Sequence, residues 1–294
     1  MKPLLLCLTA LVCVLPPPTL ADKEVRQLVG KWDVVSVANG QANLRVFFAG
    51  EGPTIVMLPG RGRGPRAMEP LAERLIAAGF RIVLPEPRGY GESVGPLEGV
   101  TLRDLGIDLA RAIESIGTAP VVVVGHAFGN RIARMLASDR PDLVKAVVLL
   151  AAGGKYPARP EASANLRVYF DKGLPAERRI EAGKAALFGP KSNPRPDDIA
   201  LDGTSADTSK AQISASDPKV FPLEAWWPGG KAPMLVIQGL EDVIAPPENG
   251  RSLKADYPDR VTLVEFPGLG HAMLRERPDL TAEAIAMFVR KLGN

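Results

Sequence analysis

Cysteine is almost absent from this sequence of 294 residues: there are two, Cys7 and Cys13, and both lie near the N-terminus. Both fall within residues 1–21, which we expect to be a cleaved signal peptide for the reasons given below. A mature chain beginning at Asp22 would have no thiol. It would therefore form no disulfide, use no cysteine nucleophile and bind no metal through cysteine, as suits an oxidising compartment.

A long hydrophobic run is lacking as well. The apolar stretch at residues 4–15 has about half of the roughly 20 residues that a membrane-spanning helix needs. Lys2 precedes this stretch, and Thr19-Leu20-Ala21 follows it as a small-residue cleavage site, an order typical of a secretory signal. The sequence therefore predicts a secreted or periplasmic protein with no membrane association after cleavage of the signal.

Charge of one sign is not concentrated anywhere in the chain. The 36 basic and 33 acidic residues are spread along the sequence, and the formal net charge is +3. We therefore expect neither nucleic acid nor a membrane surface as a partner. With 46% hydrophobic and 23% charged residues, the composition is that of a globular protein with one substantial core. No internal repeat is visible, and nothing indicates the oligomeric state.

Short apolar runs alternate with amphipathic stretches over most of the mature chain. Asn39-Gly40, between alternating segments at 32–37 and 44–48, predicts an antiparallel hairpin at its start. Unbroken β-branched runs separated by helices then indicate strands buried on both faces of a mostly parallel sheet. The expected fold class is α/β. The predicted strands are residues 55–58, 82–84, 121–124, 144–150, 234–237 and 261–266, and the predicted helices are 67–78, 102–116, 131–137 and 278–292.

The alternation stops at residues 154–230, where proline, alanine and charged residues dominate. We interpret this segment as a cap inserted into a core formed by residues 22–153 and 231–294. Because the cap would set the shape of the pocket, the sequence does not identify a substrate. Helical periodicity persists at residues 166–170 and 180–188, whereas 190–216 has the weakest pattern.

The most informative motif runs from Val121 to Asn130, Val-Val-Val-Val-Gly-His-Ala-Phe-Gly-Asn, and takes a buried strand through a turn into a helix. It resembles the nucleophile elbow Gly-x-Ser-x-Gly of the α/β-hydrolase family, with Gly125 and Gly129 in the glycine positions. Glycines there let the chain turn sharply and lift the middle residue above the sheet. In this chain that residue is Ala127, which has no nucleophilic atom.

The resemblance extends over nearly the whole mature chain and implies the α/β-hydrolase fold, with helices on both faces of the sheet. Asp242, just past a predicted strand, matches the family's acid, and His271, in a Gly-Leu-Gly-His turn, matches its general base. Gly60 and Arg61 follow the first parallel strand. The resemblance therefore implies an oxyanion hole made by the backbone amides of Arg61 and Phe128. No cofactor and no metal ion are expected.

Neighbouring residues compete for some of these roles. Glu241 is a rival acid beside Asp242, although the spacing to the following proline favours Asp242. His126, the second of only two histidines, flanks the elbow, and we expect it to pack beneath it. Trp226 and Trp227 either line the mouth of the pocket or pack in the core, as aromatic residues of a cap usually do.

Ala127 excludes covalent acyl transfer through residue 127, because a serine there would attack the substrate while His271 takes its proton. Two explanations stay open: a native alanine, or a Ser→Ala substitution that inactivates an enzyme. We favour a native alanine, because an inactivated enzyme is normally produced without its leader. Labelling of another hydroxyl, such as Ser93, by a phosphonate would instead show that the nucleophile lies elsewhere.

Three classes of function follow from this arrangement. His271 and Asp242 can still activate water or abstract a proton, so the first is noncovalent hydrolysis of a small ester, lactone or epoxide-like molecule, or proton abstraction beside a carbonyl. The second is a catalytically inactive protein that binds a small ligand under the cap. The third, an interaction scaffold, has no specific support. Retention of both residues favours chemistry, since a binding protein has little need of the pair.

Overall fold

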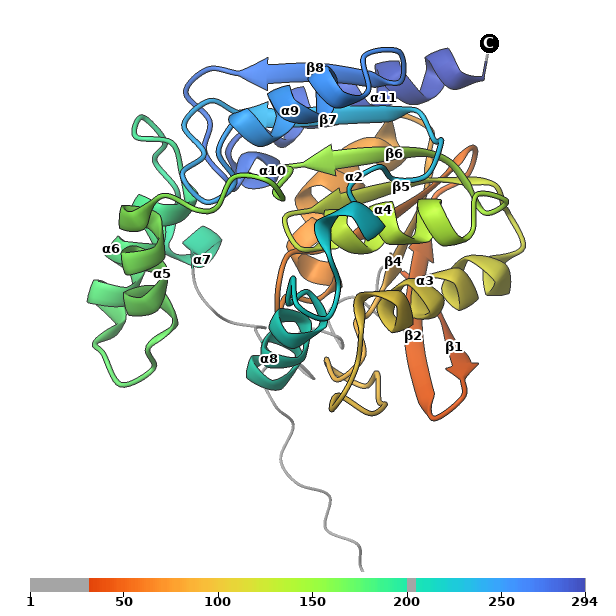
Figure 1. The fold of residues 1–294 in the computed structure, drawn as a ribbon, viewed down its shortest axis with the longest axis horizontal. Coiled ribbons are helices and arrows are strands. Elements are labelled where there is room, and N and C mark those ends of the chain that lie inside the picture. Colours follow the sequence, from red (N-terminus) through yellow and green to blue (C-terminus); the bar gives the residue numbers. More distant parts are fainter. Residues whose placement is uncertain (1–31, 200–204, 294) are drawn as a thin grey trace, which may run out of the picture.

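The computed structural model describes residues 32–199 and 205–293. The expected signal peptide falls outside these ranges. The described chain forms an eight-stranded sheet with helices on both faces (Figure 1). The strand order across the sheet is β1-β2-β4-β3-β5-β6-β7-β8. The strands are β1 (Asp33–Asn39), β2 (Ala42–Ala49), β3 (Thr54–Leu58), β4 (Arg81–Pro85), β5 (Val121–His126), β6 (Val144–Leu150), β7 (Met234–Gly239) and β8 (Val261–Phe266).

The N-terminal hairpin forms where the Asn39-Gly40 pair predicts it. β1 and β2 are antiparallel, Asn39 pairs with Ala42, and Gly40 turns the chain with a φ of +58°. β2 also pairs antiparallel with β4, whereas all strand pairs from β4 to β8 are parallel. The predicted α/β class, with a mostly parallel sheet and an antiparallel start, is confirmed.

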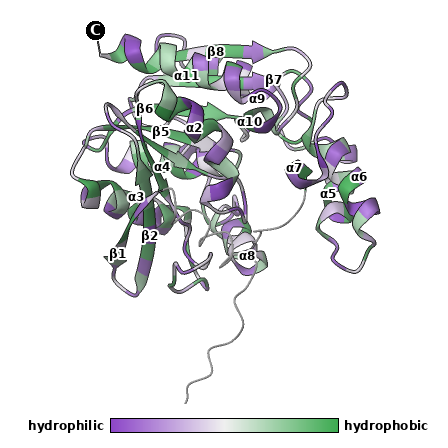
Figure 2. Cartoon of the chain, turned by 180° about the vertical axis from the view of Figure 1, so that it is seen from behind, coloured by the Kyte–Doolittle hydropathy of each residue, from purple (hydrophilic) through white to green (hydrophobic). Residues whose placement is uncertain are grey.

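Two helical layers enclose this sheet, and each has its own apolar core. Side chains of α3, α4 and α9 pack on one face of the sheet, and those of α2, α10 and α11 pack on the other. In Figure 2 the central strands are mostly green, the hydrophobic end of the scale, as expected for strands covered on both sides. The helices are α2 (Glu69–Ala77), α3 (Leu102–Ile116), α4 (Gly129–Asp139), α9 (Glu248–Asp256), α10 (Met273–Glu276) and α11 (Pro278–Leu292).

Local signals explain where the predicted helix ends are correct and where they are not. Thr101 and Asp104 form a reciprocal capping box at the start of α3, and Gly117 ends the helix in the left-handed region, so this helix has its predicted bounds. α4 begins at Gly129, two residues earlier than predicted, because the elbow turn leads directly into it. Before α2, the chain forms a 3-10 helix (Pro65–Met68), which shortens the predicted helix.

The expected insertion, residues 154–230, falls between β6 and β7. Figure 1 shows α5, α6 and α7 together at one side of the sheet, with α8 apart from them. The weakest part of the sequence pattern contains a regular helix, α8, whose first turn is capped by the Ser205 hydroxyl accepting from the Thr208 amide at 3.1 Å. The segment contains α5 (Pro160–Phe170), α6 (Ala176–Leu187), α7 (Pro196–Ile199), α8 (Ala206–Ala215) and a 3-10 helix (Leu223–Ala225).

Trp226 and Trp227 belong to the core, each with 4% of its surface exposed. The fully buried guanidinium of Arg134 lies over both rings, at 4.5 and 5.0 Å from their centroids. It also donates to the Gly153 carbonyl at 2.7 Å. This stack joins α4 to the end of the inserted segment. Across the described ranges, no helix has the length and apolarity that a membrane span requires.

Candidate active site

The order of the strands determines where a site can form. β3 lies between β4 and β5, so the direction of the crossovers changes at β3, and α/β folds bind ligands at such a point, beyond the carboxyl ends of the strands. Leu58 at the end of β3 pairs with Gly125 near the end of β5, so the loops after these strands are neighbours. A cavity of about 800 Å³ opens there, and Arg61, Ala127 and His271 are among its lining residues.

The elbow has the sharp geometry that its glycines predict. A Cβ on Gly125 would lie 2.5 Å from the backbone of Asn130, and one on Gly129 would lie 2.6 Å from the Leu58 carbonyl oxygen, so both positions exclude a side chain. Ala127 has a φ of +49°, a left-handed conformation that is uncommon for a residue with a Cβ. Its amide donates to the Leu150 carbonyl at 3.0 Å, which fixes the turn to β6.

His271 and Asp242 form a buried hydrogen-bonded pair. His271 Nδ1 lies 3.0 Å from Asp242 Oδ2 and 3.2 Å from Oδ1, and the side chains are 7% and 0% exposed. The amides of Ile244 and Ala245 donate to Asp242 Oδ1 at 2.9 and 2.8 Å. A carboxylate held in this way favours a proton on Nδ1 and leaves Nε2 to accept one. The rival acid, Glu241, is exposed.

The loop after β3 approaches the elbow closely. A Cβ built on Gly60 would lie 3.6 Å from the Cβ of Ala127. Within the described residues, neither the Arg61 amide nor the Phe128 amide donates a hydrogen bond. Both residues line the cavity. Two amides without a partner beside the elbow are what an oxyanion hole requires.

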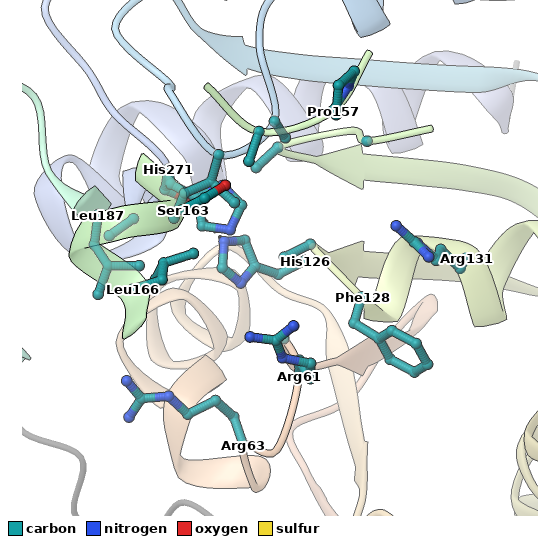
Figure 3. A pocket seen from close by; sticks show the side chains of 18 of the residues that line it. Arg61, Arg63, His126, Phe128, Arg131, Pro157, Ser163, Leu166, Leu187 and His271 are labelled. Atoms are coloured by element: carbon teal, nitrogen blue, oxygen red, sulfur yellow. Dashed lines mark hydrogen bonds between the residues drawn. The ribbon is translucent and has the colours of Figure 1, made fainter. Parts of the chain in front are cut away.

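The sequence led us to expect His126 beneath the elbow, but the structure places it elsewhere. It lines the cavity, and Figure 3 shows its ring facing that of His271. Its Nε2 lies 2.9 Å from the His271 carbonyl oxygen, so Nε2 carries the proton and Nδ1 is left as an acceptor. Burial, together with the neighbouring His271, lowers the pKa of His126 to about 3. His126 is therefore neutral at physiological pH.

The loop that carries His271 is attached to the inserted segment. Glu276 accepts from the Gly270 amide at 2.8 Å through Oε1 and from the Gly189 amide at 2.9 Å through Oε2. The Ala272 amide donates to the Leu187 carbonyl at 2.8 Å. The end of α6 and the His271 loop thus share one hydrogen-bond network. No sequence signal identifies Glu276, because its role depends on two segments about 80 residues apart.

Ser93 lies outside this site. It is 2% exposed, its hydroxyl accepts from the Arg45 amide at 2.9 Å, and it is not among the residues that line the cavity. The Ser93 side chain therefore stabilises the fold and is not placed to act as a nucleophile in this cavity. Over residues 32–199 and 205–293, no group of three or more metal-ligating side chains is close enough to hold a metal ion.

Residues 55–284 match the model of the "Alpha/beta hydrolase family". The chain belongs to this family. The resemblance seen in the sequence motifs is therefore confirmed at the level of the family and its fold.

Two relatives of the chain have names that refer to different activities. The "Putative non-heme bromoperoxidase BpoC" of Mycobacterium tuberculosis is 30% identical over 257 residues, which cover 84% of this chain and 97% of that protein. Its crystal structure superposes with a TM-score of 0.73 and covers 87% of this chain and 97% of the other. The 2-hydroxy-6-oxo-6-phenylhexa-2,4-dienoate hydrolase of Burkholderia cepacia is 28% identical over 82% of this chain and 89% of its own length.

Solved structures of esterases have the same fold. An esterase from Exiguobacterium antarcticum superposes with a TM-score of 0.72 at 20% identity, covering 87% of this chain and 98% of that one. At this identity the likeness concerns the fold alone. The chain is thus similar to hydrolases and to a putative bromoperoxidase.

Proposed function

We propose that this chain hydrolyses a small carboxylic ester or lactone by general-base catalysis, with water as the nucleophile in place of a serine. The observation that carries the proposal is the His271–Asp242 hydrogen bond at 3.0 Å, at the cavity that Ala127 also lines. A general base needs geometry and a suitable pKa, but not a neighbouring serine. The two unpartnered amides of the cavity favour a carbonyl substrate over an epoxide.

The proposed reaction has two steps. His271 Nε2 removes a proton from water while the water oxygen forms a bond to the carbonyl carbon, and the carbonyl oxygen becomes an oxyanion near the Arg61 and Phe128 amides. The tetrahedral intermediate then expels the alcohol oxygen, which takes the proton back from the imidazolium. Asp242 holds the ring and stabilises its charge between the two steps. No covalent acyl-enzyme forms.

A panel of short and long esters and lactones tests this proposal. We expect slow, linear hydrolysis by the wild-type chain, with no burst of product and no inhibition by serine-directed phosphonates. His271→Ala should reduce the rate by about 10²–10⁴-fold, the usual contribution of a general base, and Asp242→Asn should reduce it strongly, because the imidazole loses its preferred tautomer. An unchanged rate in His271→Ala would contradict the proposed base.

A second function, ligand binding without catalysis, is favoured by Ala127 itself. Loss of the nucleophile from a serine hydrolase costs on the order of 10⁶ in turnover. If the wild-type chain binds esters but hydrolyses none of them, while Ala127→Ser is active, the cavity serves binding alone.

Export belongs to the proposal as well, on the basis of the leader-like residues 1–21. Expression of the full chain in a bacterial host, followed by fractionation, should place it outside the cytoplasm. N-terminal sequencing of the product should begin at Asp22. A full-length product that stays in the cytoplasm would contradict export.

A further inference from the structure

The cavity is rich in cationic side chains, and most of them have partners. Arg63 donates to the Tyr169 hydroxyl at 2.8 Å, Lys155 lies 2.5 Å from Asp256, and Arg275 lies 3.7 Å from Asp198. The five cationic residues that line the cavity are Arg61, Arg63, Arg131, Lys155 and Arg275.

Arg61 and Arg131 differ from the other three. Among the described residues, neither guanidinium forms a hydrogen bond or lies within ion-pair distance of a carboxylate, and the Nε atom of Arg61 is buried without a partner. Each lies over an aromatic ring instead, Arg61 at 5.5 Å from the Phe170 centroid and Arg131 at 5.3 Å from that of Trp226. In Figure 3 Arg61 extends from the loop after β3, and Arg131 extends from α4.

The two cations also line the same cavity. Burial lowers the pKa of both guanidinium groups, and the positive charge of Arg61 lowers that of Arg131 further. Partly buried like charges without a counterion are costly, since burial removes water that would otherwise screen them. An anion bound beside both guanidinium groups would offset this cost.

We propose that Arg61 and Arg131 bind a carboxylate, so that the substrate of this cavity carries a free carboxylate besides its reacting ester group. A guanidinium presents a planar pair of N–H donors that matches a carboxylate. The rings of Phe170 and Trp226 hold the two guanidinium groups in place. Because the cost of desolvation rises steeply with charge, these apolar surroundings favour a monoanion over a phosphate dianion. The ester part of this inference rests on the proposed function, whereas the carboxylate part does not.

The location of the pair explains what a bound carboxylate would do. Arg61 is the residue whose amide faces the proposed oxyanion hole, and Arg131 lies in the first turn of the helix that follows the elbow. In Figure 3 Arg131 and His271 lie on opposite sides of His126. An anchored carboxylate would thus orient the substrate with its ester group toward Ala127 and His271.

Isothermal titration calorimetry with pairs of carboxylates and primary amides tests the proposal. Butyrate and butyramide, octanoate and octanamide, and phenylacetate and phenylacetamide differ in charge but hardly in shape. We expect at least one carboxylate to bind about tenfold tighter or more than its amide, as charge-assisted hydrogen bonds to arginine imply. Arg61→Gln and Arg131→Gln should each remove most of this preference.

Lys155→Gln is the matched control, because Lys155 lines the same cavity but has Asp256 as its partner. It should keep the preference. Thermal unfolding shows whether each variant is folded, and Arg61→Lys and Arg131→Lys, which keep the charge, should retain part of the preference if a glutamine variant does not fold.

Several results would overturn the inference: equal binding of acid and amide, no binding of any carboxylate, an equal loss in Lys155→Gln, or tighter binding of inorganic phosphate than of every carboxylate. Carboxylate titration and ester hydrolysis, both measured on the wild-type chain, separate the two proposals. Carboxylate preference without ester hydrolysis contradicts only the proposed function, whereas hydrolysis without a preference for anionic esters contradicts only this inference.

Discussion

The ring of His126 lies 5.1 Å from the ring of His271, centroid to centroid, and His126 Nε2 donates to the backbone carbonyl of His271. One histidine of the chain thus fixes the main chain of the other. Protonation of His126 would place a positive charge beside the His271 ring, and the low pKa of His126 prevents this over the physiological range.

Acid should destabilise the protein partly through His126. An unfolded histidine takes up a proton as the pH falls through about 6.5, whereas folded His126 remains neutral until about pH 3. Stability is therefore lost between these values by about 1.4 kcal/mol per pH unit, which is roughly 3 kcal/mol by pH 4. Urea unfolding at pH 7, 5 and 4 should show a smaller loss for His126→Phe than for the wild type. An identical pH dependence of the two proteins would contradict the buried, neutral histidine.

Glu86 should destabilise the protein at high pH. It is 1% exposed, and burial raises its pKa to about 7 despite hydrogen bonds from the Ser93 and Glu92 amides. Between about pH 4.5 and 7 the unfolded carboxyl has lost its proton while the folded one keeps it, so stability falls as the pH rises through this range. Glu86→Gln keeps an acceptor for the two amides. At pH 8 the free energy of unfolding of Glu86→Gln should exceed that of the wild type by on the order of 2 kcal/mol.

At pH 4.5 the Glu86→Gln variant and the wild type should be equally stable. Glu98→Gln, which removes an exposed carboxylate, is the control and should leave the pH profile unchanged. A gain in Glu86→Gln that does not depend on pH would indicate better packing rather than the loss of a buried charge.

Ala127→Ser should create a reactive serine without rebuilding the turn. The elbow already has its left-handed residue and both close glycine contacts, so the new hydroxyl would stand at the cavity beside His271. We expect labelling by a fluorophosphonate and burst kinetics with an activated ester. The double variant Ala127→Ser/His271→Ala should lose both, because an unassisted hydroxyl is a weak nucleophile. Labelling of the unmodified chain at any residue would contradict Ala127 as the vacant nucleophile position.

Gly125→Ala should destabilise the fold severely. Its Cβ would lie 2.5 Å from backbone atoms of Asn130 and Gly129, which cannot move without opening the elbow, so we expect a loss of about 2–4 kcal/mol. Gly106→Ala, inside α3, is the control. Its Cβ would lie 3.7 Å from Met135 Cγ, an ordinary contact, and the better helix propensity of alanine should stabilise the protein by about 0.5–1 kcal/mol. Chemical unfolding of the three proteins measures both effects.

Patterns that are local in the sequence predicted the fold well. The observed bounds of β6, β8, α3 and α11 agree with the bounds predicted from the apolar runs. A buried strand or an amphipathic helix needs apolar residues at the positions that pack against the core, so its own sequence shows where it begins and ends. The elbow could be placed for the same reason, since Gly125 and Gly129 are required by the turn that they form. α8 was missed because its packing, which leaves Ile213 exposed, produces little periodicity.

Contacts between distant segments could not be predicted in this way. The position of His126 depends on the His271 loop, which is 145 residues away in the chain. Arg61 and Arg131 are ordinary basic residues in the sequence, and only the structure shows that they line one cavity in which the other cationic residues have partners. A sequence of balanced charge does not reveal which of its charges lack a partner after folding.

Glu276 ties the segment after α6 to the loop that carries His271. Leu187 and Phe188, at the end of α6, line the cavity, and the adjacent Gly189 shares Glu276 with Gly270, the residue before His271. A displacement of α6 would therefore be transmitted through these hydrogen bonds to the loop that carries His271. If His271 is the base, as we propose, a bulky ligand that displaces α6 would also disturb proton transfer, whereas a ligand that fits without moving α6 would leave the His271–Asp242 hydrogen bond intact.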